Sequence, residues 1–217
     1  MELYLVRHGE TESNREKRYQ GWTESPLSEE GVRQAEKTGL FLGRKGIDAV
    51  YCSDLKRAEH TARIIGASCG TEPVASALLR EINFGRWEGL TYNEIELQWG
   101  TQIREWFDDP FSRSAPDGET LEDVRERLCT FFGELEGWHE SCKKDRSRVA
   151  LVSHGGTIRV LLYHALGLTR DQFWNLRVEN ASISLLSMNK NVTEVIYHNR
   201  VDHLSSGEKR EELSDGL

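Results

Sequence analysis

The chain has 217 residues and a formal net charge of -8, with 37% hydrophobic and 29% charged residues. This acidic balance argues against broad non-specific binding to nucleic acid or to an anionic membrane surface. No apolar run reaches the roughly 20 residues that span a bilayer, and Met1-Glu2-Leu3 lacks the basic start of a signal peptide. We therefore expect a cytoplasmic globular protein with neither a nucleic-acid nor a membrane partner.

Strand and helix signals alternate along the first part of the chain. Short apolar segments predict buried strands at Leu3–Val6, at Ala49–Cys52 and, more weakly, at Val74. Amphipathic stretches predict two helices between them, one capped by Ser28 and continuing to about Gly43, the other capped by Asp54 and continuing through Ala67. This order is typical of βαβ units.

The second part of the chain begins with an irregular insertion at residues 78–119 that is rich in Trp and Phe. Two short helices are expected there, around Tyr92–Trp99 and Gln102–Phe107. The elements predicted after it are a long helix over Leu121–Ser141, a strand over Val149–Val152, a helix over Thr157–Leu166 and two strands over Ser182–Met188 and Val192–Tyr197. We expect a single α/β domain over residues 1–198 with a mixed sheet, followed by a polar tail over residues 199–217.

The segment Arg7-His8-Gly9-Glu10-Thr11 directly follows the first predicted strand. Open α/β sheets bind their ligands at the carboxyl ends of strands. The guanidinium of Arg presents a fork of donors that fits phosphate oxygens, and a neutral imidazole can attack phosphorus as a nucleophile. A surface turn after an edge strand would give the same short pattern, so the decision rests on the rest of the chain.

Three further side chains follow predicted strands in the same way. Arg57 lies one helical turn beyond the second strand, and Glu81 follows the third. His154 stands between the fourth strand and a helix N-terminus, whose free amides favour an anion. Two histidines, two arginines and one glutamate should therefore meet in one crevice.

The chain resembles the histidine phosphatase superfamily, which includes cofactor-dependent phosphoglycerate mutase, over about residues 1–190. The resemblance is carried by four elements in the family's order and spacing: Leu5-Val6-Arg7-His8-Gly9-Glu10-Thr11, Ser53-Asp54-Leu55-Lys56-Arg57-Ala58, Glu81 and Ser153-His154-Gly155. It implies a three-layer α/β/α fold with a mixed, mostly parallel sheet and the insertion acting as a lid.

The resemblance also implies roles for individual residues. His8 would become phosphorylated, with the phosphoryl group held by Arg7, Arg57 and His154, and Glu81 would donate the proton. Further contacts would come from Asn14 and the amide of Gly155, with Gln20 and Gly21 lining the substrate side.

Two arginines and a second imidazole can stabilise a transferring phosphoryl group without a metal ion. The four cysteines show no metal-ligand spacing. We therefore predict a phosphomonoesterase without metal or cofactor that acts on a small phosphomonoester. The alternative of another class is an inactive phosphate-binding scaffold, which would be expected to lack part of this set of residues.

The segment from Glu81 to Tyr92 most resembles the α-ribazole phosphatase branch, which removes phosphate from α-ribazole 5'-phosphate in cobalamin nucleotide-loop assembly. We expect Trp87, Trp106 or Phe111 to line a lid over a ring-shaped leaving group. A phosphoserine phosphatase, a fructose-2,6-bisphosphatase-like enzyme and a broad-specificity phosphatase are the alternatives. A homodimer through the terminal strand pair is left open.

Other polar residues near these motifs are expected to be structural. Arg80 is interpreted as a charge partner of Glu81 or as a solvated side chain, and Arg159 as a packing or ion-pair residue. The remaining histidines match no family position: His60, His139, His164, His198 and His203.

Overall fold

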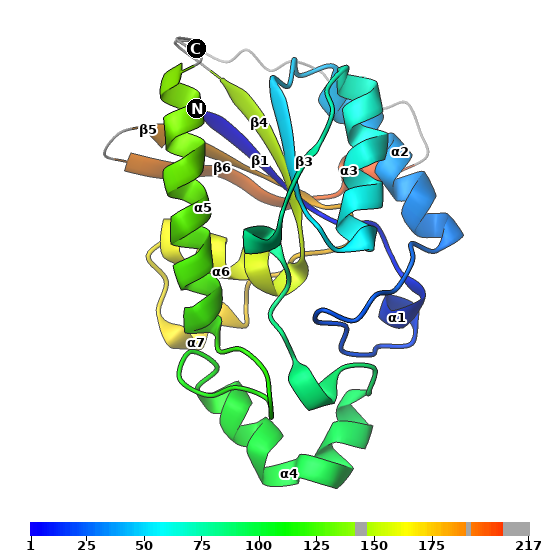
Figure 1. The fold of residues 1–217 in the computed structure, drawn as a ribbon, viewed down its shortest axis with the longest axis vertical. Helices are drawn as coiled ribbons and strands as arrows, with labels where there is room; N and C mark the ends of the chain where they lie inside the picture. The colour runs from blue at the N-terminus through cyan, green and yellow to red at the C-terminus, as the bar shows by residue number, and fades with distance from the viewer. Residues whose placement is uncertain (142–146, 190–191, 206–217) are drawn as a thin grey trace.

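The protein folds around one mixed β-sheet, shown in Figure 1. The computed structural model describes residues 1–141, 147–189 and 192–205. Within these ranges the sheet has six strands in the order β3-β2-β4-β1-β5-β6. Their bounds are Glu2–Arg7 (β1), Ala49–Ser53 (β2), Val74–Ser76 (β3), Arg148–Ser153 (β4), Ile183–Asn189 (β5) and Val192–Arg200 (β6). Strands β1 to β4 are parallel and β5 and β6 pair antiparallel, which confirms the predicted mixed, mostly parallel sheet.

Helices cover both faces of this sheet, with α2 and α3 on one side and α5 and α6 on the other (Figure 1). The α-helices are Glu12–Arg15 (α1), Glu29–Gly43 (α2), Lys56–Cys69 (α3), Tyr92–Asp108 (α4), Leu121–Ser141 (α5), Gly155–Ala165 (α6) and Arg170–Phe173 (α7). Short 3₁₀ turns cover Ala77–Leu79, Gly85–Trp87 and Asp202–Leu204. The three-layer α/β/α architecture is therefore confirmed. None of the helices in the described ranges combines the length and the apolar character needed to cross a bilayer.

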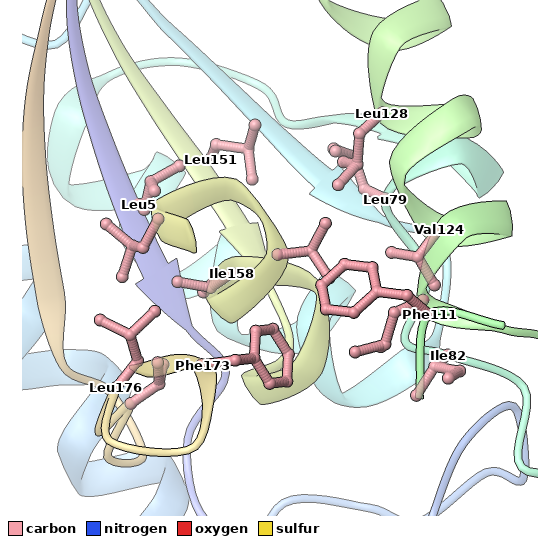
Figure 2. Packing of buried hydrophobic residues seen from close by; sticks show 14 of the residues in the cluster. Leu5, Leu79, Ile82, Phe111, Val124, Leu128, Leu151, Ile158, Phe173 and Leu176 are labelled. Carbon is pink, nitrogen blue, oxygen red and sulfur yellow. The ribbon is translucent and has the colours of Figure 1, made fainter. Parts of the chain in front are cut away.

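The central strands β1 and β4 are apolar on both faces because both faces are covered. Alternate residues of a strand point to opposite sides, so Leu3 and Leu5 enter the core beneath α5 and α6, whereas Tyr4 and Val6 enter the core beneath α2 and α3. Figure 2 shows the first of these cores, in which Leu5 lies close to Ile158 of α6. Full burial of one such side chain stabilises the fold by about 1.5–3 kcal/mol.

The pairing register of the two central strands sets the position of the residues that follow them. Arg7, the last residue of β1, lies opposite Ser153, the last residue of β4. The residue that follows each strand is a histidine. The amide of His8 donates a 2.9 Å hydrogen bond to the carbonyl of Ser153. The sheet therefore brings His8 and His154 together at its carboxyl edge.

The insertion at residues 78–119 extends beyond the carboxyl ends of the parallel strands (Figure 1). Its main element is α4, which begins after Thr91 with a capping box that is closed by Glu94. The two short helices expected here are joined into one helix that is kinked at Trp99, where φ is -132° and ψ is 29°.

Two aromatic residues of the insertion were expected to line a lid, and for these two the expectation is wrong. Trp87 is 0% exposed and Phe111 is 9% exposed, and both belong to the core. Figure 2 shows Phe111 in this core. Phe111 packs edge to face on Phe173, with the ring centres 5.3 Å apart. The insertion has to bury its own apolar surface. Trp87 packs on Trp106 of α4, and Phe111 packs on Tyr163 of α6.

The prediction that Asp54 caps α3 is also wrong. The N-cap residue of α3 is Leu55, which makes no side-chain capping bond. The carboxylate of Asp54 instead forms a two-pronged ion pair with Arg80, with distances of 2.7 and 2.6 Å. A bidentate pair provides two charge-assisted hydrogen bonds to a full positive charge, and Arg80 therefore determines the position of this carboxylate.

The ordered fold continues past the expected boundary at residue 198. Strand β6 runs to Arg200, and the turn after it packs on α2, where Lys37 donates a 2.6 Å hydrogen bond to the carbonyl of Leu204. The ring of His203 lies 5.4 Å from that of Phe41. The rest of the predicted tail, residues 206–217, lies outside the described residues.

Candidate active site

Two buried imidazoles face each other at the carboxyl edge of the sheet. The ring centres of His8 and His154 are 5.1 Å apart and the ring planes are inclined by 61°. Both side chains are almost fully buried, with exposures of 3% and 0%. The parallel pairing of β1 and β4 creates this arrangement, because each histidine is the first residue beyond its strand.

Two arginines of the site bind backbone carbonyls. Arg7 Nη1 donates to the carbonyl of Val178 at 2.6 Å. Arg57 Nη2 donates to Gly21 at 2.6 Å and its Nη1 donates to Thr23 at 3.1 Å. Neither guanidinium forms an ion pair with a carboxylate of the described residues. The positive charge of both side chains therefore remains uncompensated at close range.

Several buried nitrogens of the site also have no hydrogen-bond partner among the described residues. They are Arg7 Nε and Arg57 Nε, which are donors, and both ring nitrogens of His154, one of which is a donor in the neutral ring. Buried polar groups in proteins are nearly always hydrogen-bonded. A cluster of buried donors between two arginines has the chemical character of an oxyanion site.

Burial and neighbouring charges keep both imidazoles neutral. Burial, followed by the positive charges of Arg57 and Arg7, lowers the pKa of His8 well below its ordinary value of 6.5. Burial, followed by Arg57 and His8, lowers the pKa of His154 in the same direction. Burial lowers the pKa of Arg7 to about 10, so this guanidinium still carries its charge at neutral pH.

The tautomer of His8 follows from one hydrogen bond. Its Nδ1 lies 2.7 Å from the carbonyl oxygen of Gly9. A carbonyl oxygen can only accept, so in the neutral ring Nδ1 carries the proton. The lone pair is then on Nε2, which is the nitrogen available for nucleophilic attack.

Glu81 is fixed at the N-terminus of α6. Its carboxylate accepts hydrogen bonds from the amides of Gly156 at 2.9 Å and Thr157 at 3.0 Å. Its backbone carbonyl accepts from Trp22 Nε1 at 2.8 Å and from Arg127 Nη2 at 3.0 Å. Both ends of this residue are thus held, which sets the carboxylate beside the two arginines.

Two cavities adjoin at this site. The first, which we call the polar cavity, has a volume of about 220 Å³ and is lined by Arg7, His8, Asn14, Lys17, Arg18, Tyr19, Gln20, Gly21, Glu81 and Phe84. The second, the aromatic cavity, has a volume of about 260 Å³, and its distinctive lining consists of Trp106, Phe107, Phe173, Trp174 and Arg159. Arg7, Tyr19, Glu81 and Phe84 line both, so the two cavities form one continuous site.

The predicted site residues come together here, with differences in their position. Asn14, Gln20 and Gly21 line the polar cavity with His8. Gly155 lines the aromatic cavity instead. A Cβ atom at Gly155 would lie in van der Waals contact with the guanidinium of Arg7, at 3.5 Å.

Arg57 and His154 lie behind the cavity walls. Neither belongs to the lining of the two cavities. They are buried against His8 and the loop that contains Gly21.

Sequence reasoning missed part of the aromatic cavity. Phe107 and Trp174 both line it and pack on each other, with ring centres 5.1 Å apart. Of the three aromatic residues expected there, only Trp106 lines it. Arg159 also lines it, one helical turn after Gly155. The sequence signal that could have predicted Arg159 at the site is its position four residues after Gly155, on a helix that begins at the site.

Neither of the two interpretations of Arg80, a charge partner of Glu81 or a solvated side chain, describes its contacts. Arg80 binds Asp54, and its guanidinium lies 4.7 Å from the ring centre of Trp22. Arg80 thus supports the loop that carries Trp22.

No group of three or more His, Cys, Asp or Glu side chains within the described ranges is arranged to hold a metal ion.

A family model described as histidine phosphatase superfamily (branch 1) matches residues 3–201. The chain belongs to this superfamily. It is therefore a hydrolase that acts on phosphomonoesters, and the residues that an inactive scaffold would be expected to lack are all present.

Other histidine phosphatases are similar to this one over most of their length. The chain is 31% identical over 204 residues to phosphoserine phosphatase 1 of Hydrogenobacter thermophilus, with 94% of each chain covered. It is 36% identical over 189 residues to a probable phosphoglycerate mutase GpmB of Cronobacter sakazakii, with 85% of this chain and 83% of that protein covered.

Solved structures of other proteins have a fold similar to that of this chain. Bacillus stearothermophilus YhfR has a TM-score of 0.86 and 29% identity, with 94% of this chain and 99% of that chain covered. The α-ribazole phosphatase from Shigella flexneri has a TM-score of 0.82 and 26% identity, with coverage of 97% and 100%. These relatives differ in the activity that they are named for, so similarity alone does not select a substrate.

Proposed function

We propose that this histidine phosphatase hydrolyses its substrate through a phosphohistidine formed on Nε2 of His8. The observation that carries the proposal is the pair of neutral, facing imidazoles, one of which has its Nδ1 proton held by the carbonyl of Gly9. A neutral imidazole with a free Nε2 is the form that attacks phosphorus.

In this mechanism the phosphoryl group lies in the polar cavity. Its oxygens accept hydrogen bonds from Arg7 Nε, Arg57 Nε and the ring N–H of His154, which have no other partner among the described residues. Arg57 and His154 approach the group from behind the cavity wall, where they are buried against Gly21 and His8. Asn14 and the amide of Gly155 add donors at the edge of the group. Phosphoryl transfer spreads negative charge over three oxygens, so fixed donors of this kind stabilise the transition state.

Glu81 supplies and removes the proton. It lines both cavities, which suits a group that acts between the phosphoryl group and the leaving oxygen. As the bond from Nε2 of His8 to phosphorus forms and the ester P–O bond breaks, Glu81 protonates the leaving oxygen. Water then attacks phosphorus, Glu81 takes its proton, the N–P bond breaks and inorganic phosphate leaves.

The leaving group would occupy the aromatic cavity. Gln20 and Gly21 would bound the substrate on the polar side, and the rings of Trp106, Phe107 and Trp174 would contact the leaving group. Such a wall suits a flat ring, which supports α-ribazole 5'-phosphate as the substrate. The similarity to the Shigella flexneri α-ribazole phosphatase supports the same assignment.

Phosphoserine is the second candidate substrate. It is favoured by the similarity to the Hydrogenobacter thermophilus phosphoserine phosphatase, which extends over 94% of both chains. It is also favoured by Arg159, because this cation lines the cavity in which the leaving group would lie.

A comparison of kcat/KM for α-ribazole 5'-phosphate, phosphoserine and 3-phosphoglycerate, with and without EDTA, tests this proposal. We expect turnover that EDTA does not abolish and that is lost in His8→Ala. His60→Ala is the matched control, because His60 is an exposed histidine on α3. Retained turnover in His8→Ala would refute the mechanism, and a hundredfold preference for phosphoserine would refute the α-ribazole assignment.

A further inference from the structure

Arg159 lies in the wall of the aromatic cavity without a carboxylate partner. Its Nε donates a 3.0 Å hydrogen bond to the carbonyl of Leu176. Its guanidinium carbon lies 5.7 Å from the ring centre of Phe173 and 5.5 Å from that of Trp174. Contact with these rings holds the position of the guanidinium, and its Nη donors form no ion pair with a described carboxylate.

Arg159 differs from Arg7 and Arg57 in the source of the negative charge that can compensate it. Burial lowers the pKa of Arg7, Arg57 and Arg159, and in each case Glu81 is the first carboxylate that opposes this effect. When Glu81 carries the proton that it donates, this negative charge is absent. In the proposed mechanism the phosphoryl group then compensates Arg7, which lines the polar cavity, and Arg57, which donates to the carbonyl of Gly21 in the wall of that cavity. Arg159 instead contacts Phe173 and Trp174 in the aromatic cavity and does not line the polar cavity.

Arg159 is partly buried, and a charge withdrawn from water without an opposing charge is costly, so the missing anion has to enter the aromatic cavity with the substrate. We propose that Arg159 binds an anionic group, a carboxylate or a second phosphate, on the leaving group. The substrate class is then a phosphomonoester whose leaving alcohol is itself an anion. This inference rests on the proposed function, because the roles of Glu81 and of the polar cavity come from it, and it favours phosphoserine over α-ribazole 5'-phosphate.

The test uses two pairs of substrates in which the second member has lost the carboxylate (first pair) or has a hydroxymethyl group in its place (second pair). The pairs are phosphoserine with phosphoethanolamine, and 3-phosphoglycerate with glycerol 1-phosphate. We expect the wild-type enzyme to prefer the carboxylate-bearing member of at least one pair, measured as the ratio of kcat/KM. Arg159→Met should lower this ratio by about 30-fold or more, as expected when one partner of a buried charge pair is removed. Arg159→Lys should restore part of it, because it restores the charge without the fork.

Two further variants separate this role from others. Arg170→Met removes an exposed arginine that contacts the Phe111 ring at 5.9 Å and pairs with Asp109, and it should keep the wild-type ratio. Lys17→Met removes the lysine that lines the polar cavity, where the backbone has a φ of 56°. If Lys17→Met lowers the ratio and Arg159→Met does not, the anion binds in the polar cavity and the proposal is wrong.

The remaining outcomes are equally decisive. If Arg159→Met slows both members of each pair equally, Arg159 only anchors the loop at Leu176 and the proposal is refuted. A wild-type preference for α-ribazole 5'-phosphate over all four substrates would refute it as well. Failure of the proposed function has a separate readout: no phosphate would be found on His8 after rapid quenching with any of these substrates.

Discussion

The polar and the aromatic cavity share four residues but are built in different ways. The polar cavity depends on strand ends: His8 follows β1, and the arginines around it are held by backbone carbonyls. The aromatic cavity is lined by side chains of α4, α6 and the turn after α7, which contact one another through their rings. The sheet register therefore determines the chemistry, whereas the helices around the insertion determine which leaving group fits.

The loop that completes the polar cavity is held by a single carboxylate. Glu88 accepts hydrogen bonds from the amides of Trp22 at 2.8 Å and Thr23 at 2.6 Å, from the Thr23 hydroxyl and from the amide of Phe84 at 3.1 Å. The carbonyls of Gly21 and Thr23 in this loop in turn orient Arg57. Phosphate contacts are thus fixed before the substrate arrives, as catalysis by preorganised donors requires.

The largest expected effect comes from Glu81, which belongs to both cavities. Glu81→Gln keeps an acceptor for the amides of α6 but cannot donate the proton. We expect the phosphorylation rate to fall by about 10²–10⁴-fold for alkyl phosphates and much less for p-nitrophenyl phosphate, because nitrophenolate leaves without protonation. Single-turnover rates with both substrates provide the measurement. An equal loss for both substrates would show that Glu81 is not the acid.

The second prediction tests whether the polar cavity acts on every substrate in the same way, whatever the leaving group. Arg57→Ala removes a donor that we assign to the phosphoryl group and that does not line the aromatic cavity, so kcat/KM should fall by about 10²–10³-fold for every substrate. The control is Arg80→Ala, which removes a nearby arginine paired with Asp54. A loss with Arg57→Ala that depends strongly on the leaving group would contradict the division into two cavities.

A smaller effect is expected on the aromatic side. Trp174 contacts Phe107 and donates a 3.1 Å hydrogen bond to its carbonyl. Trp174→Ala should lower kcat/KM by about tenfold for the preferred leaving group, while rates on methyl phosphate should change little. Steady-state kinetics on both substrates are the measurement, and a uniform loss would place Trp174 in the chemical step instead.

The smallest effect concerns stability and pH. His8 and His154 have lowered pKa values in the folded protein, whereas an unfolded chain binds protons at the ordinary value of 6.5. Below that pH the unfolded state binds more protons, so the free energy of unfolding should fall by up to about 1.4 kcal/mol per pH unit for each imidazole. Urea unfolding at pH 7, 6 and 5 measures this slope. His8→Gln should make it shallower, and an unchanged slope would contradict the buried neutral state of His8.

The polar cavity and the sheet could be predicted from the sequence because both follow from continuous local patterns. Leu3–Val6 and Val149–Val152 are unbroken apolar runs, and the residues after them carry the chemistry. Parallel pairing then requires them to meet, whatever the helices do in detail.

The aromatic cavity could not be predicted in the same way. Trp87 and Phe111 are no less aromatic than Phe107 and Trp174, and the sequence contains no periodic pattern that tells a core ring from a cavity ring. Which rings line the cavity depends instead on tertiary structure, such as the kink of α4 at Trp99 and the packing of α7. Asp54 shows the same limit, because its partner Arg80 is 26 residues away.

The central claim is that Nε2 of His8 carries the phosphoryl group during turnover. In Glu81→Gln, water activation should be slow enough for the phosphoenzyme to accumulate after reaction with p-nitrophenyl phosphate. NMR and peptide mapping of this species should place one phosphate on Nε2 of His8, since Nδ1 donates to the carbonyl of Gly9. A phosphate on Nδ1 or on His154, or the absence of any covalent phosphate while turnover continues, would contradict the account.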